Sequence, residues 1–113
     1  MTMFEKELKN GRFFCSECIK CNKLVWPPSD FCNRCFSKVR WRQLSTRASL
    51  VEFSKKDDTI FCIAEFEGTI RIMGALEADV KELTIGKELQ LVKCDYDGTE
   101  RFIFQLKQQI LEK

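Results

Sequence analysis

The 113-residue sequence contains no histidine. This absence excludes Cys–His and Ser–His nucleophile pairs, and it removes histidine as a metal ligand. A lysine, aspartate or glutamate remains available for proton transfer, but no motif singles one out. We therefore predict that the isolated chain is not an enzyme, and we identify no candidate catalytic residue.

Long apolar runs are also missing, and none approaches the roughly 20 residues of a membrane-spanning helix. Residues 1–12 are charged and lack the apolar segment of a secretory signal. We therefore expect a cytoplasmic protein without a membrane partner, in which the seven cysteines stay reduced. An odd number of cysteines also argues against a complete disulfide framework.

Four of these cysteines form two CxxC pairs with the spacing of a zinc ribbon. The pairs are Cys18/Cys21 and Cys32/Cys35, and ten residues separate them. Four thiolates complete a tetrahedral shell around Zn²⁺, so the metal would be structural, with no open position for a substrate. Iron in a rubredoxin-like Cys₄ site is the alternative.

A fifth cysteine, Cys15, makes a second register possible, because Cys15 and Cys18 also form a CxxC pair. A zinc knuckle turns sharply after its second cysteine, where glycine or asparagine tolerates a left-handed backbone. The Cys18/Cys21 register places Asn22 at that turn, whereas the other register places the β-branched Ile19 there. The sequence favours the first register and leaves Cys15 as a free thiol near the site.

The N-terminal residues have the pattern of a short amphipathic helix. Thr2 and Glu5 have the spacing of a capping box, and Phe4 and Leu8 fall on one helical face. We predict a helix over residues 2–10, ended by Gly11. Such a short helix is marginal alone. We expect its apolar face to pack on this chain's own domain, with a partner contact as the alternative.

The remaining pattern indicates a mostly β protein. After a short strand at residues 24–26, strands are expected over residues 48–54, 60–66, 69–73, 88–94 and 101–106, with a one- to two-turn helix within residues 76–84. Five short strands with a small helix between the third and fourth are typical of an OB-fold, and an SH3-like barrel is the nearest competitor. The expected domains are an N-terminal helix (1–12), a rubredoxin-like Cys₄ zinc ribbon (13–42) and a five-stranded OB-fold barrel (43–113).

Two features of the ribbon bear on binding. Trp26, Phe31 and Trp41 are expected to form a small core around the metal, although Trp26 beside its two prolines would also suit a groove. Charge is unevenly distributed: residues 1–47 carry ten Lys/Arg against four Asp/Glu, a net +6, whereas residues 48–113 carry nine against thirteen, a net −4. Part of the basic excess compensates the negative zinc–thiolate centre, so this is a weak signal of nucleic-acid binding.

The order of these features resembles domain-of-unknown-function family 35, the zinc-ribbon/OB-fold proteins associated with acyl-CoA. The residues that carry the resemblance are the Gly-Arg-Phe-Phe run (11–14), the segment 18–35 with its Pro-Pro pair, and segments 67–74, 83–87 and 101–104. The chain departs from the family at Asn22 and Phe36, where glycine is usual or common, and at Cys15. The Phe36 difference affects the expected geometry of the second knuckle.

The resemblance implies a non-catalytic accessory or scaffold subunit of a thiolase-type, acyl-CoA-condensing enzyme, with structural Zn²⁺ and a contribution to CoA or acyl-CoA binding. CoA carries a diphosphate and a 3′-phosphate, and arginine suits bidentate phosphate contacts. The candidate phosphate ligands are Lys38, Arg40, Arg42 and Arg47, which cluster around Trp41 in the linker between ribbon and barrel. A solvated basic linker is the alternative interpretation of these four residues.

Two other functions fit the same pattern. A single-stranded nucleic-acid binder would need basic residues such as Arg71, Lys93 and Arg101 on one barrel face, beside exposed aromatic side chains. A docking module without a small ligand would use the helix face and the adjacent pair Phe13 and Phe14.

Overall fold

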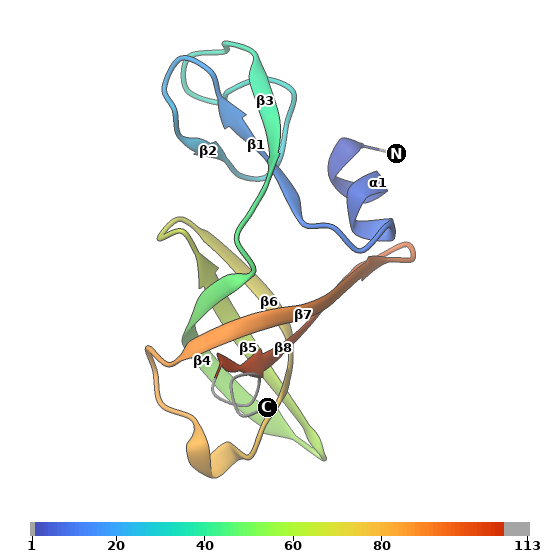
Figure 1. The fold of residues 1–113 in the computed structure, drawn as a ribbon, viewed down its shortest axis with the longest axis vertical. Helices are drawn as coiled ribbons and strands as arrows, with labels where there is room; N and C mark the ends of the chain where they lie inside the picture. The colour runs from blue at the N-terminus through green and yellow to red at the C-terminus, as the bar shows by residue number, and fades with distance from the viewer. Residues whose placement is uncertain (1, 108–113) are drawn as a thin grey trace.

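In the computed structural model the chain forms two β-structures placed end to end, with one helix beside their junction (Figure 1). Residues 2–107 are described. The sequence also predicts a polar tail over residues 107–113, which lies, apart from Lys107, outside the described residues. The molecule measures 45 × 28 × 27 Å. The ribbon occupies one end of the long axis and the barrel the other.

The ribbon is a three-stranded antiparallel sheet in the order β2-β1-β3. Its strands are β1 (Phe14–Cys18), β2 (Leu24–Val25) and β3 (Val39–Gln43). Strand β1 pairs with both neighbours, and Cys18 stands opposite Val39. Beyond this pair, an isolated bridge joins Phe31 to Lys38 and extends the sheet toward the second knuckle.

The barrel closes through the strand order β4-β5-β6-β8-β7. Its strands are β4 (Arg47–Lys56), β5 (Thr59–Phe66), β6 (Ile70–Glu77), β7 (Glu88–Tyr96) and β8 (Glu100–Leu106). All neighbouring pairs are antiparallel except β6 and β8. A five-stranded closed barrel of this kind is the predicted OB-fold, so the expected fold class is confirmed.

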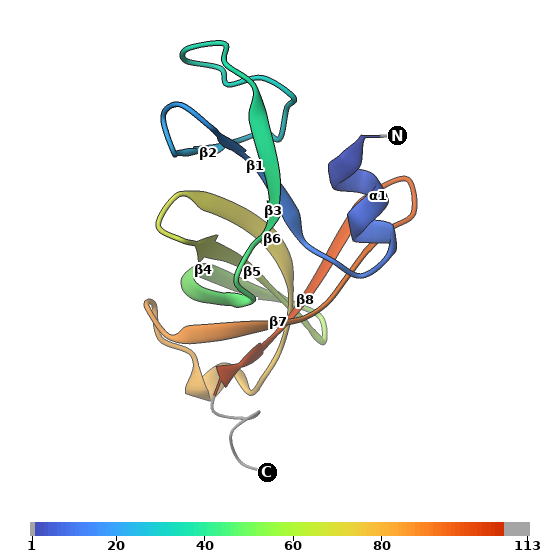
Figure 2. The ribbon, with the colours of Figure 1, turned by 45° about the horizontal axis from the view of Figure 1, so that its top comes forward.

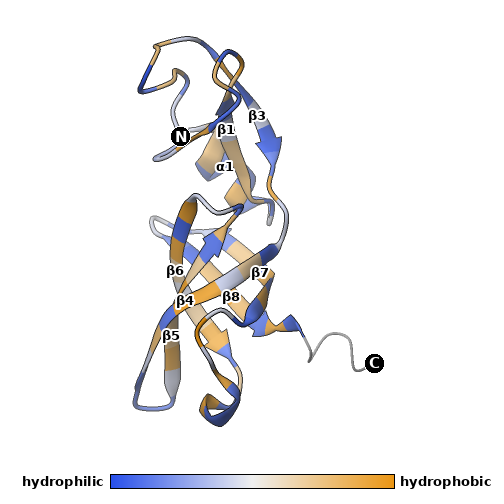
Figure 3. Cartoon of the chain, turned by 90° about the vertical axis from the view of Figure 1, so that its left-hand side faces the viewer, coloured by the Kyte–Doolittle hydropathy of each residue, from blue (hydrophilic) through white to orange (hydrophobic). Residues whose placement is uncertain are grey.

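Side chains alternate between the barrel interior and its surface, as the sequence predicts. In β6, Ile70 and Ile72 are buried whereas Arg71 and Met73 are exposed. Figure 3 shows the same alternation as changes between orange and blue along the barrel strands. The interior is closed by large apolar side chains, among them Phe66 and Phe104, both fully buried.

One expected boundary is wrong in the region after residue 73. Strand β6 continues to Glu77, whereas the expected short helix is present as a single 3₁₀ turn, Val80–Glu82. The reason lies at Gly74, where a Cβ would approach the Phe102 carbonyl oxygen to 2.7 Å. Glycine lets β6 pass close to β8 and continue, so that Leu76 enters the core as a strand residue.

The N-terminal helix α1 (Met3–Lys9) begins at the predicted capping box. The Glu5 N–H donates to Thr2 Oγ1, and the Thr2 N–H donates to Glu5 Oε1, both at 3.1 Å. Phe4 and Leu8 are buried in the same core as the barrel side chains. The helix lies between the ribbon and the β7–β8 hairpin (Figure 2), so its apolar face packs on its own chain.

Edge-to-face aromatic contacts connect the ribbon to the barrel through this helix. The Phe4 ring contacts Trp26 of the ribbon, with centroids 5.8 Å apart, and lies 6.3 Å from Phe13. Phe13 in turn lies 5.0 Å from Phe66 and 5.4 Å from Phe102. The Phe13 ring therefore fills the end of the barrel interior that faces the ribbon.

The prediction of an aromatic core around the metal is wrong. Beside the cysteines, the small apolar cluster of the ribbon contains only Val25 and the partly buried Val39 among the described residues. Trp26 and Trp41 pack against the main core instead, and Phe31 is exposed. The sulfur atoms and two valines fill the space beside Cys18, so the tryptophans lie farther along the sheet, toward the barrel.

Candidate metal centre and ribbon–barrel cleft

The two CxxC pairs lie on two turns of the same form. The Asn22 N–H donates to the Cys18 carbonyl at 2.9 Å, and the Phe36 N–H donates to the Cys32 carbonyl at 3.0 Å. Asn22 and Phe36 have φ values of 60° and 61°, so both follow their cysteine pair in the left-handed conformation. The knuckle turn that we predicted from Asn22 is present, and Phe36 adopts it without being a turn-forming residue.

The turns bring four sulfur atoms into one group. The Sγ atoms of Cys18, Cys21, Cys32 and Cys35 all lie within 4.8 Å of one another. Cys35 Sγ is 3.5 Å from both Cys18 Sγ and Cys21 Sγ. A tetrahedral ion with Zn–S bonds of about 2.3 Å separates its sulfur ligands by about 3.8 Å. The donor set and its spacing therefore fit Zn²⁺ in a closed, structural site.

Local hydrogen bonds prepare part of this group for the thiolate form. Hydrogen bonds from Ser37 lower the pKa of Cys35 to about 6, and backbone hydrogen bonds from residues 35 and 34 lower the pKa of Cys32. Hydrogen bonds to the sulfurs of Cys35 and Cys18 raise the pKa of Cys21 to about 12. A cation among the four sulfurs would reverse that last shift, because a coordinated thiol is deprotonated.

The other three cysteines lie outside this group. Cys15 is fully buried, its thiol donates to the Val25 carbonyl at 3.5 Å, and burial raises its pKa to about 11. Burial raises the pKa of Cys62 to about 11 and also raises that of Cys94. These thiols are core residues, and their raised pKa values make them poor nucleophiles at neutral pH.

Three of the four candidate phosphate ligands share one face of the ribbon. Lys38 precedes β3, and Arg40 and Arg42 follow at two-residue intervals within it, so their side chains alternate onto the same side. Glu17 stands opposite Arg40 on β1. The carboxylate of Glu17 binds both arginines, at 3.0 Å from Arg40 Nε and 3.3 Å from Arg42 Nε.

Arg42 also joins the ribbon to the barrel. Its Nη1 and Nη2 atoms donate to the two carboxylate oxygens of Glu67, at 3.1 and 2.7 Å. Glu67 belongs to the tight turn between β5 and β6. This bidentate pair lowers the pKa of Glu67 and raises that of Arg42. Two carboxylates, those of Glu17 and Glu67, therefore bind the arginine that we expected to contact phosphate.

The fourth candidate, Arg47, lies apart from this row. It begins β4 in the barrel, and its Nε is 3.6 Å from the Glu88 carboxylate. Lys38 forms no ion pair within residues 2–107. The structure thus brings together Lys38, Arg40 and Arg42 and leaves Arg47 on another surface.

A polar cleft lies where the ribbon meets the barrel. Its volume is about 410 Å³, and its lining residues are Glu17, Asn22, Lys23, Leu24, Arg34, Arg42, Glu67 and Thr69. Lys23 and Arg34 form no ion pair with any described residue. Sequence reasoning missed both. The signal was their position next to the two knuckles, since each lies two residues after a metal-site cysteine, Cys21 or Cys32.

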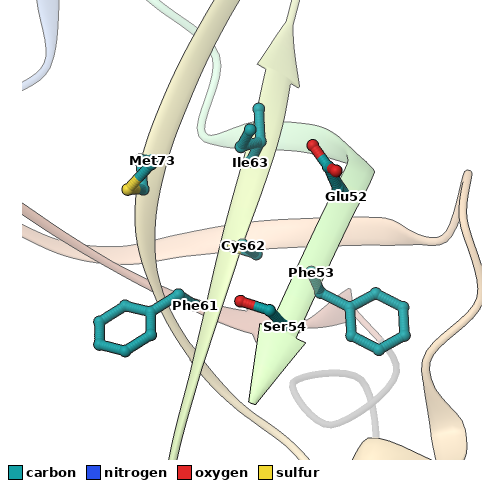
Figure 4. Close-up of a pocket in the computed structure, with 7 residues that line it drawn as sticks. All are labelled: Glu52, Phe53, Ser54, Phe61, Cys62, Ile63 and Met73. Atoms are coloured by element: carbon teal, nitrogen blue, oxygen red, sulfur yellow. The ribbon is translucent and has the colours of Figure 1, made fainter. Parts of the chain in front are cut away.

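A second hollow, of about 250 Å³, lies on the outside of the barrel and is largely apolar (Figure 4). Phe53, Phe61, Ile63 and Met73 line it, together with Glu52, Ser54 and Cys62. Three neighbouring strands, β4, β5 and β6, contribute these side chains. The hollow contains no basic residue, so it does not suit a phosphate group.

The nucleic-acid hypothesis gains no support from the barrel surface. Arg71 is paired with Glu65 at 3.2 Å, and Arg101 lies 3.7 Å from Asp97. Lys93 does lie beside Arg101, but the hollow that they share also contains an aspartate. No helix among the described residues is long and apolar enough to cross a membrane.

Comparison with known proteins supports both halves of this description. Residues 6–40 match the family model of the ChsH2 rubredoxin-like zinc ribbon domain. Comparison with curated proteins gives no match. Among solved structures, a chain of the Ltp2-ChsH2(DUF35) aldolase is similar over 91% of each chain, with a TM-score of 0.74 and 15% identity.

A second similar structure is a DUF35-family protein of unknown function from Sulfolobus solfataricus. The similarity covers 88% of this chain and 81% of the other, with a TM-score of 0.64 and 15% identity. At this level of identity the two likenesses establish the fold alone. The resemblance to domain-of-unknown-function family 35 is confirmed at the level of the fold: residues 6–40 match the ChsH2 zinc ribbon model, and the chain has, over most of its length, the fold of DUF35 proteins.

Proposed function

We propose that the chain is a non-catalytic accessory subunit of an enzyme that acts on acyl-CoA, of the thiolase type, and that it contributes to CoA binding. The observation that carries this proposal is the structural likeness, over 91% of both chains, to a protein named as part of an Ltp2-ChsH2 aldolase. That likeness extends over most of the chain, so it supports a similar role for this chain.

The chemistry of the chain agrees with a supporting role. Its metal centre has four thiolate donors and no open position, so a bound Zn²⁺ would neither polarise a substrate nor activate water. The buried thiols of Cys15 and Cys62 have raised pKa values and face the core. With no histidine in the sequence, neither a Cys–His nor a Ser–His nucleophile pair can form.

The cleft between ribbon and barrel is the proposed contact for the CoA phosphates. Lys23 and Arg34 line it without carboxylate partners among the described residues, and Lys38 and Arg40 follow the same face of the ribbon. Because Arg42 is engaged by Glu67 and Glu17, we assign it to holding the cleft together. A charged hydrogen bond to phosphate contributes about 1.5–3 kcal/mol.

The first test is co-purification of the tagged chain from its native host at moderate salt, followed by mass spectrometry. We expect an acyl-CoA-condensing or aldolase enzyme in fixed stoichiometry with the chain. Recovery of nucleic acid without an enzyme, lost as salt rises, would contradict the proposal and support the strand-binding alternative.

The second test measures CoA binding to the purified complex by calorimetry. A Lys23→Ser, Arg34→Ser double variant should bind CoA about tenfold or more weakly than the wild type. Lys81→Ser is the matched control, because Lys81 is an exposed lysine on the 3₁₀ turn of the barrel. Equal CoA affinity in all three proteins would refute the proposed phosphate site while leaving the subunit role standing.

A further inference from the structure

The end of the ribbon farthest from the barrel exposes three large apolar side chains. Ile19, Phe31 and Phe36 are 51%, 55% and 78% exposed. All three belong to the knuckle region: Ile19 follows Cys18, and the other two flank the second cysteine pair. The loop that holds Phe31 and Phe36 precedes β3 at the outer end of the ribbon (Figure 1). We call this surface, defined by Ile19, Phe31, Phe36 and Lys38, the ribbon tip.

The backbone register places these side chains side by side. Cys18 stands opposite Val39, so Ile19 stands opposite Lys38, and its N–H donates to the Lys38 carbonyl at 3.2 Å. On its other edge Lys38 is bridged to Phe31. Residues directly opposite each other in antiparallel strands share a face. The backbones of Ile19 and Phe31 therefore flank that of Lys38 on its two edges, which places the three residues next to one another at the end of the sheet.

Phe36 completes the tip at a position that phenylalanine does not suit. Its φ of 61° lies in the left-handed region, which glycine or asparagine adopts with less strain. Its ring is 78% exposed and is absent from both buried clusters of the described chain. Neither the backbone nor the packing of this protein explains the residue. The knuckle requires the left-handed backbone but not the phenylalanine, so an exposed aromatic side chain at this strained position points to a function of that side chain.

The charges around the ribbon tip are mostly of one sign. Lys20 follows Ile19 in the first knuckle and Lys38 belongs to the tip itself, and Asp30 is the one acidic residue of residues 18–39. The apolar surface of the barrel differs, because its hollows are bordered by Glu52 and Glu100 as well as by Arg101. The ribbon tip therefore selects for an acidic partner, whereas the barrel surface does not.

We propose that the ribbon tip is the surface by which this chain docks on its enzyme partner, at an apolar depression bordered by acidic side chains. This inference rests on the proposed function as an accessory subunit and specifies which part of the chain makes the contact. Exposed aromatic side chains supply the buried centre of such an interface, and complementary charges at its rim set orientation and the rate of association.

The test uses the full chain with its metal in the native-host co-purification, quantified as the molar ratio of enzyme to chain. A Phe36→Gly, Phe31→Ser double variant should lower that ratio at least tenfold. Lys38→Glu should lower it as well, because it places a like charge against an acidic rim. Ile85→Ser is the control, since Ile85 is 59% exposed on the barrel, away from the ribbon.

Phe36→Gly separates a docking role from a structural one. Glycine relieves the left-handed strain, so the melting temperature and zinc content of this single variant should equal or exceed those of the wild type. Loss of the enzyme with unchanged or higher stability supports docking. A lower melting temperature or loss of zinc would mean that Phe36 holds the knuckle, and it would overturn the inference.

The remaining outcomes are distinguishable from one another. If the tip variants retain the enzyme as well as the wild type does, the docking inference fails and the subunit role stands. If the wild type brings down no such enzyme, both proposals fail. Two further results would overturn the assigned partner: a wild-type dimer in analytical ultracentrifugation that the double variant abolishes, or co-sedimentation with phosphatidylserine vesicles that it abolishes.

Discussion

The ribbon and the barrel are stabilised by different means. The buried cluster of the ribbon consists of cysteines and two valines, with Cys18, Val25 and Cys32 at its centre. The barrel has a continuous apolar core that also takes in Phe4, Leu8 and Phe13 from the N-terminal segment. A piece of about 40 residues rarely buries enough apolar surface to fold alone without a metal or disulfides. We therefore expect the ribbon, but not the barrel, to need a bound metal in order to fold.

The largest expected effect breaks the ribbon alone. Cys32→Ser removes one of the four grouped sulfurs, and structural zinc contributes about 10–16 kcal/mol of binding free energy in small ribbons. We expect loss of zinc and loss of hydrogen-exchange protection in β1 to β3, with the barrel strands partly retained. Zinc analysis and exchange by mass spectrometry measure both.

Cys15→Ala is the matched control for that variant, because it tests the other CxxC register. Cys15 lies outside the sulfur group, so its variant should keep a full equivalent of zinc. Near-native zinc content in Cys32→Ser, or zinc loss in Cys15→Ala, would contradict the ligand assignment.

The second largest effect concerns the barrel. Phe13→Ala removes a fully packed ring that contacts Phe4, Phe66 and Phe102. Such a truncation costs about 3–5 kcal/mol of unfolding free energy. Denaturant unfolding should show this loss while zinc content stays unchanged. Phe61→Ala, at a surface position, should cost far less. Zinc release from Phe13→Ala would show that the two halves are not held separately.

The smallest effect concerns the ion pair between the halves. The pKa of Glu67 is lowered in the folded protein. The contribution of Glu67 to the free energy of unfolding is therefore complete above the usual glutamate pKa of about 4.3, and it is lost as the pH falls through the pKa of the folded state. Glu67→Gln should therefore destabilise the protein at pH 7, by about 0.5–1 kcal/mol because both side chains are partly exposed.

Unfolding of Glu67→Gln and wild type between pH 7 and pH 3 measures that contribution. The difference between the two proteins should shrink toward zero at the acid end, and metal loss at low pH affects both alike. Glu82→Gln, on the exposed 3₁₀ turn, should match the wild type throughout. A constant difference across the range would show that Arg42 and Glu67 are not electrostatically coupled.

Local rules predicted the elements that depend on neighbours in sequence. The Thr2/Glu5 cap, the Asn22 turn and the alternation of Ile70 and Ile72 all appear where the spacing placed them. Each of these features depends on interactions between residues only a few positions apart, so the local sequence is enough to predict it. The expected cluster of basic residues was partly predictable too, because β-strand alternation puts Arg40 and Arg42 on one face.

Contacts between distant segments could not be predicted in the same way. Strand β6 continues past residue 73 because Gly74 meets the Phe102 carbonyl, which is 28 residues away in sequence. The engagement of Arg42 depends on Glu67, which reaches it from the other half of the molecule. The position of Trp26 depends on Phe4. Each outcome requires the three-dimensional register of the strands, which no local pattern specifies.

The aromatic contacts from Trp26 through Phe4 and Phe13 to Phe66 fix the orientation of the ribbon relative to the barrel. The outer end of the ribbon lies far from this junction in a molecule 45 Å long. A rotation of the ribbon by a few degrees about the junction would therefore displace Phe36 much more than it displaces Phe13. We therefore expect substitutions at the junction to misplace the outer end of the ribbon relative to the barrel, even where every contact within that end is intact.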